Sequence, residues 1–194
     1  MTDFGALGFD PAPGDVATIQ GFVAQLDQGA QSTADALSLM DSGDGSWEGA
    51  AATAFRATLD DAFRPQLADV HDAFVISRDA LSTWASELSG FQARARRLAE
   101  EADAATGAIS RRSAELQQAR TDALNDPIAA GDSTDLADAQ RRARAAEAML
   151  EEIRRRARAL LAEVDARAAV CANLLAGGVA RIAAYAGSAW DQFT

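Results

Sequence analysis

Residues 136–164 read LADAQRRARAAEAMLEEIRRRARALLAEV, and their apolar or alanine positions recur at alternating intervals of three and four residues. This heptad pattern is typical of an α-helix that packs along one narrow seam. A helix of about 50 residues is roughly 75 Å long, so it has to lie against a second helix of similar length. The seam positions are Leu136, Ala139, Ala143, Ala146, Leu150, Ile153, Ala157, Leu160 and Val164.

Two further stretches carry the same pattern, one over residues 16–40 and one from residue 81 to residue 109. Turn-forming residues separate the three stretches, at 41–45 and 125–134. Folding the chain at these loops places residues 16–40 against about 50–76, and the helix after residue 134 against about 70–125. The predicted fold class is all-α, with elongated antiparallel helical hairpins: a helix-turn-helix and then a long coiled-coil-like hairpin.

Three segments follow from this layout. Residues 1–14 contain two prolines and three glycines, and we expect an extended lead-in there. Residues 15–106 form the helical hairpin, and residues 107–194 form its long helical extension. The chain ends without a stop-like structure, and Trp190 and Phe193 are expected to be exposed there. We expect either a further module after the extension or a docking point at these two residues.

Capping residues and a proline predict the helix ends. Asp15 is the expected N-cap of the first helix. Ser46 is the expected N-cap of the second, which opens near Trp47 and carries Glu48 in its first turn. Pro65 lies inside the second helical pattern, and a proline there removes a backbone hydrogen bond, so we expect a kink or short break.

Composition excludes several classes of function. The net charge is −11, all 18 basic residues are arginine, and residues 1–90 hold 14 acidic against 3 basic side chains. Such a chain matches phosphate poorly, so no nucleic acid partner is expected. A single Cys and a single His cannot build a zinc site, and no cofactor is predicted. No stretch reaches eighteen apolar residues and no cleavable signal peptide is present, so stable membrane insertion is not expected.

A short motif, Trp47-Glu48-Gly49, lies in the bend of the first hairpin. With this placement the sequence resembles the WXG superfamily, whose Trp-X-Gly lies between two antiparallel helices. The stretches GFDPAPGD at 8–15 and WEGAAATAFR at 47–56 are similar to the N-terminal trafficking domain of bacterial polymorphic toxins. The resemblance covers about residues 5–105.

The resemblance implies export by type VII (ESX-type) secretion without a cleavable signal, from a cytoplasmic precursor. It implies pairing with a small WXG-type helical protein in a four-helix bundle, recognition by the secretion ATPase, and a C-terminal toxin module with its immunity protein. Family members or their partners carry Tyr-X-X-X-Asp/Glu after the second helix. Here Tyr185 is followed by Ala189, with Asp191 two positions too late, so we expect the partner to supply that tail.

The thin, alanine-rich seams bury little surface, so the aromatic-rich first hairpin is the part that most needs another surface. The predicted protein-binding residues are Val16, Phe22, Trp47, Gly49, Phe55, Leu59 and Phe63.

No catalytic residues are predicted. His71 is expected to be partly exposed at the surface with no catalytic companion, Trp84 is expected in the core, and Cys171 is expected as a small buried residue. The alternative to a secretion domain is an intracellular coiled-coil scaffold or spacer that forms homodimers. An enzyme has little support, and pore formation by residues 168–190 would require that segment to enter lipid.

Overall fold

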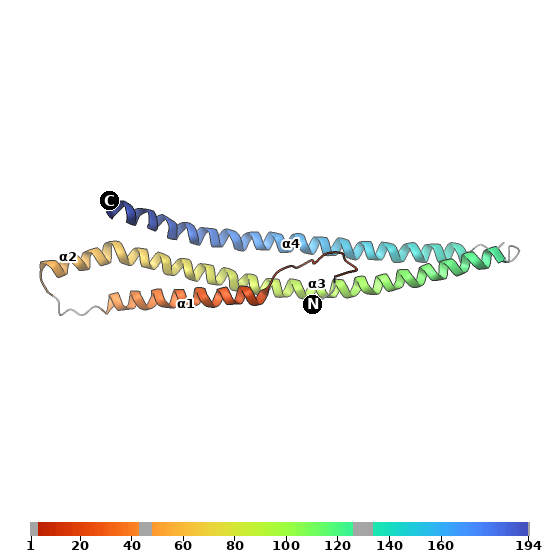
Figure 1. The fold of residues 1–194 in the computed structure, drawn as a ribbon, viewed down its shortest axis with the longest axis horizontal. Helices are drawn as coiled ribbons and strands as arrows, with labels where there is room; N and C mark the ends of the chain where they lie inside the picture. The colour runs from red at the N-terminus through yellow and green to blue at the C-terminus, as the bar shows by residue number, and fades with distance from the viewer. Residues whose placement is uncertain (1–3, 43–47, 126–133, 194) are drawn as a thin grey trace. The chain divides into compact units, whose positions relative to one another are not determined.

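The computed structural model describes residues 4–42, 48–125 and 134–193. They form α1 (Val16–Asp41), α2 (Ala50–Thr58), a π-helix η1 (Leu59–Phe63), α3 (Arg64–Asn125) and α4 (Thr134–Phe193), shown in Figure 1. These residues include no strand, and the predicted all-α class with helical hairpins is confirmed.

The chain divides into two compact units, and both long helices contribute to each. The first unit joins residues 1–13 to residues 89–165, and the second joins residues 14–88 to residues 166–194. The predicted boundary at residues 106–107 falls inside α3 and inside the first unit. The units therefore do not coincide with the segments read from the sequence.

In the first unit α3 and α4 are antiparallel partners. Their apolar faces meet along the predicted seam, and the arginines beside it pair across the two helices. Arg94 lies 2.9 Å from Glu163, and Arg156 lies 2.6 Å from Glu101. The buried seam residues are Phe91, Ala95, Leu98, Ala102 and Ala105 on α3 and Ala139, Ala143, Leu150, Ile153, Ala157, Leu160 and Val164 on α4.

The lead-in contains a turn at residues 5–8. The amides of Leu7 and Gly8 donate to the carbonyl of Phe4, and the carboxylate of Asp10 accepts from the amide of Ala12 at 2.9 Å. Gly8 takes a φ of 85°, which a glycine adopts without the steric penalty of a side chain. Bends follow at residues 9, 11 and 12, and residues 13–15 have no regular structure.

The lead-in also belongs to the core of the first unit. Leu7, Pro11 and Ala12 are buried. Arg154 of α4 donates from Nε and one terminal nitrogen to the carbonyl of Ala6, at 3.2 and 3.1 Å. Proline also has an apolar ring, and the ring of Pro11 is packed in this core.

In the second unit α1 lies antiparallel to the first part of α3 (Figure 1). Asp15 caps α1 as predicted, since its carboxylate accepts from the amide of Ala17 at 2.9 Å. Arg78 pairs with Asp27 at 2.9 Å, and Arg64 pairs with Asp41. The partner of α1 is thus the stretch from residue 64 to about residue 88, not residues 50–76 as predicted.

The register differs because Arg64, the first residue of α3, pairs with Asp41, so residues 48–63 extend past the end of α1. Gly49 is the N-cap of α2, with φ 109° and ψ 175°, a backbone conformation that is essentially restricted to glycine. The second helix therefore begins at Ala50, and Glu48 precedes it instead of lying in its first turn. Ser46 and Trp47 lie outside the described residues.

The predicted break near Pro65 takes the form of η1. The amide of Arg64 donates to the carbonyl of Leu59, five residues back, which is the π-helical spacing. Pro65, the second residue of α3, has no N–H to donate to the carbonyl four residues before it. The π-helical turn of η1 therefore lies directly before the position at which Pro65 cannot donate a backbone hydrogen bond.

Candidate protein-binding surfaces

The seam of α1 is only partly covered. Its positions Val16, Ile19, Val23, Leu26, Thr33, Leu37 and Met40 are all half-buried, and only Ala30 is buried. The α3–α4 seam of the first unit consists mostly of buried residues. The second unit therefore leaves more of its own apolar surface in contact with water.

Three of the predicted binding residues come together on α2 and η1. Phe55, Leu59 and Phe63 follow one another at intervals of four residues, and we call them the α2–η1 face. Phe55 and Phe63 are each 52% exposed, and Leu59 is half-buried. Both short helices lie past the end of α1, whose last residue pairs with the first residue of α3 (Figure 1).

The other predicted residues lie elsewhere. Phe22 is exposed on α1, and Val16 is half-buried at the start of that helix. Gly49 is exposed at the start of α2 and Trp47 lies outside the described residues. The α1–α3 register places Phe22 well along α3 from its start, so the structure does not bring it onto the α2–η1 face.

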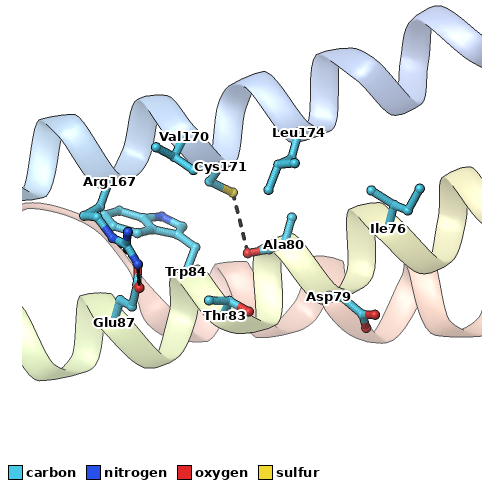
Figure 2. Close-up of a pocket in the computed structure, with 10 residues that line it drawn as sticks. All are labelled: Ile76, Asp79, Ala80, Thr83, Trp84, Glu87, Arg167, Val170, Cys171 and Leu174. Carbon is cyan, nitrogen blue, oxygen red and sulfur yellow. Dashed lines mark hydrogen bonds and ion pairs between the residues drawn. The ribbon is translucent and has the colours of Figure 1, made fainter.

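A groove that no sequence pattern indicates lies between α3 and α4 in the second unit (Figure 2). The groove has a volume of about 340 Å³. Its floor is formed by Ala80 and Cys171, whose thiol donates to the Ala80 carbonyl at 3.7 Å. Its walls are mainly apolar: Ile76, Thr83 and Trp84 on α3 and Val170 and Leu174 on α4.

The groove is open to solvent at its walls. Val170 is 51% exposed and Leu174 is 48% exposed, and Trp84 is half-buried instead of lying fully in the core as predicted. Cys171 is buried, as expected. Burial raises the pKa of the Cys171 thiol, and the nearby charge of Glu87 raises it further, so the thiol is a poor nucleophile at neutral pH.

Carboxylates follow the groove along α3. Asp69 and Asp72 precede it, and Asp79 and Glu87 line it. Arg167 of α4 pairs with Glu87. The second unit as a whole holds 13 acidic and 5 basic residues and carries −8 of the chain's net charge of −11.

His71 is partly exposed, as expected, and it also contacts α1. It is half-buried between α3 and α1, where its Nδ1 lies 3.0 Å from the Ala30 carbonyl and 3.1 Å from the Thr33 hydroxyl. Thr33 is a seam position of α1, so the imidazole is a packing and hydrogen-bonding partner of that helix. The floor of the groove at Ala80 lies more than two helical turns further along α3.

In residues 4–42, 48–125 and 134–193, no three or more His, Cys, Asp or Glu side chains are grouped as metal ligands would be. Nor does any helix within those ranges hold a segment of the length and hydropathy that crossing a bilayer requires. No protein-family model, curated protein or solved structure matches the chain.

Proposed function

We propose that this chain is a targeting and partner-binding domain of a type VII secretion substrate, and that it pairs with a small WXG-type helical protein before export. The domain carries no chemistry of its own. Its task is to present a helical surface to the partner and, together with the partner, to the secretion ATPase. The partner supplies the Tyr-X-X-X-Asp/Glu tail, and a toxin module with its own immunity protein follows the domain.

The observation that carries the proposal is the pair of half-exposed phenyl rings on the α2–η1 face. Phe55 and Phe63 lie just after the Trp47-Glu48-Gly49 bend of an antiparallel hairpin. A phenylalanine buries about 150–250 Å² when fully covered, so each ring leaves roughly 100 Å² for a partner. At about 25 cal/mol per Å², covering one ring contributes up to about 2.5 kcal/mol.

Charge supports a heterologous partner over a second copy. Two copies of the second unit, each at −8, repel one another as they approach. A neutral or basic helical protein is not repelled. Electrostatic complementarity of this kind acts mainly on association rate and on the choice of partner.

The test is co-expression of the tagged chain with the small helical protein encoded beside it, in a bacterium with an active type VII system. Phe55→Ala/Phe63→Ala is expected to lower the tagged chain in the culture supernatant, and its co-purified partner, at least tenfold. Leu124→Ala is the matched control, because Leu124 is 81% exposed but lies in the other unit. Its export should equal that of the wild type.

A second variant addresses the bend. Gly49→Ala forces a side chain into φ 109°, which costs of order 1–3 kcal/mol locally and should reduce export while total helicity is retained. Export that is unchanged in both variants contradicts the proposal.

The alternative, a homodimeric scaffold, predicts a purified mass of two chains with no small partner, which size-exclusion chromatography with light scattering measures.

A further inference from the structure

We propose that the groove between α3 and α4 in the second unit is a docking site for one amphipathic α-helix of a partner protein, with an apolar stripe flanked by Arg or Lys. The groove is distinct from the α2–η1 face, and the inference does not depend on the export route. Three observations carry it: the lining of the groove, its place on α3, and the charges along its edge.

The lining suits a helix more than a compact small molecule. The α3 wall runs from Ile76 to Glu87, which is about 16 Å along the helix axis, and the α4 wall runs alongside from Arg167 to Leu174 (Figure 2). Side chains at i, i+3, i+4 and i+7 of a third helix match a groove of this form. Small-molecule sites add a few convergent polar groups, whereas here the Cys171 thiol is already bonded to a backbone carbonyl.

The groove lies on the side of α3 that α1 does not cover. The α3 residues that meet α1 are His71, Phe74 and Arg78. At about 100° per residue, Ile76 is rotated by roughly 140–160° from all three. α1 therefore leaves the groove open, and the exposure of Val170 and Leu174 agrees with that.

The charge along the edge determines the partner's chemistry. Asp72 and Asp79 lie on the same exposed side of α3 as Ile76, and Asp79 and Glu87 line the groove itself. Asp79 already pairs with Arg78 at 2.8 Å, so the attraction for a basic helix comes from Asp72 and from the net charge of −8 on the second unit. The one basic side chain among the ten lining residues, Arg167, is held by Glu87. A helix with Arg or Lys beside its apolar stripe is attracted to this edge, whereas a helix with acidic flanks is repelled.

Two synthetic 21-residue peptides test the proposal directly. Both carry Leu at heptad positions a and d, and they differ only in having Arg or Glu at positions e and g. Fluorescence anisotropy with the purified full chain should show at least tenfold tighter binding of the Arg peptide at 50 mM salt. Equal binding of the two peptides, or no binding of the Arg peptide, overturns the inference.

Groove variants show where the peptide binds. Val170→Asp/Leu174→Asp should weaken the Arg peptide at least tenfold, and Thr83→Arg should weaken it through charge. Val179→Asp is the matched control on α4, since Val179 is 66% exposed and does not line the groove, and it should bind within twofold of the wild type. Circular dichroism verifies that each variant is as helical as the wild type.

Two further results separate the competing occupants. Asp72→Asn/Asp79→Asn should reduce the preference for the Arg peptide over the Glu peptide to less than threefold. Concentration-dependent self-association that is abolished by Val170→Asp/Leu174→Asp would instead make a second copy of the chain the occupant, and would overturn the inference.

The peptide assay is independent of the export assay. Phe55→Ala/Phe63→Ala should leave peptide binding within twofold of the wild type, because neither residue lines the groove. If export falls in Phe55→Ala/Phe63→Ala but the Arg peptide does not bind the wild-type chain, only the groove inference is overturned. If the Arg peptide binds but the export of Phe55→Ala/Phe63→Ala equals that of the wild type, only the secretion proposal is overturned.

Discussion

Replacing Gly29 with alanine tests the packing of α1 on α3. A Cβ built on Gly29 lies 2.9, 3.0 and 3.1 Å from three carbons of the Phe74 ring. Ordinary van der Waals contacts begin near 3.4 Å, so the ring or the helix has to move by about half an ångström. Overpacking of this kind costs about 1–3 kcal/mol.

Gly21 is the matched control for this substitution. It lies in the same helix, and a Cβ there meets nothing within 4 Å. Both substitutions gain the same helix propensity, about 0.5–1 kcal/mol relative to glycine. The difference in unfolding free energy between Gly21→Ala and Gly29→Ala therefore isolates the clash, and we expect about 1–3 kcal/mol. For a chain of this length, that is roughly 2–12 °C in melting temperature.

The measurement is urea unfolding followed by circular dichroism, with hydrogen exchange of the α1 amides as a local readout. In a Phe74→Leu background the difference between the two glycine variants should shrink below about 0.5 kcal/mol, as a double-mutant cycle requires for a contacting pair. Equal stabilisation by Gly21→Ala and Gly29→Ala in the wild-type background would refute the α1–α3 register described here.

The other predictions concern the lead-in, the α1 cap and the groove thiol. Arg154→Ala should make the lead-in susceptible to limited proteolysis, whereas Arg155→Ala, which removes only a surface ion pair with α4's own Glu152, should not. The Thr18 hydroxyl lowers the pKa of Asp15, so the stabilisation from this cap is complete above the unfolded pKa of about 3.9 and is lost as the pH falls through the folded value. Thermal melts should therefore show a steeper loss of stability between pH 4 and pH 2 in the wild type than in Asp15→Asn, and parallel curves would contradict the cap assignment. Burial and the raised pKa of Cys171 should make its alkylation by iodoacetamide at pH 8 at least tenfold slower in the folded chain than in urea, and equal rates would place the thiol outside the groove floor.

Heptad spacing was sufficient to locate the three long helices and their seams. The seam from Ala139 to Val164 is buried at most of its positions, and α3 ends at Asn125 as the loop residues indicated. Periodicity works here because a long helix without other partners can bury apolar side chains only along one stripe. The Asp15 cap is equally local, since its bonds reach only two and three residues ahead.

Features that depend on distant residues were not predictable in the same way. The turn formers at 41–45 indicate a bend but not which part of the following helices meets α1, a register that the pairing of Arg64 with Asp41 shows. The packing of the lead-in depends on Arg154, far away in the sequence. The groove arises where the buried pair Ala80 and Cys171 lies between more exposed side chains of α3 and α4, and no spacing within either helix indicates that arrangement.

The bond between Arg154 and the Ala6 carbonyl joins residues 148 positions apart. A ribosome adding about 5–20 residues per second needs roughly 7–30 s to cover that interval. The lead-in thus leaves the ribosome long before Arg154, which binds it, has been synthesised. The part of α3 that packs on α1 is synthesised much sooner after α1. Nascent chains are therefore expected to expose an unanchored N-terminal segment until Arg154 has been synthesised, and chaperones or a partner protein can reach the segment during that interval.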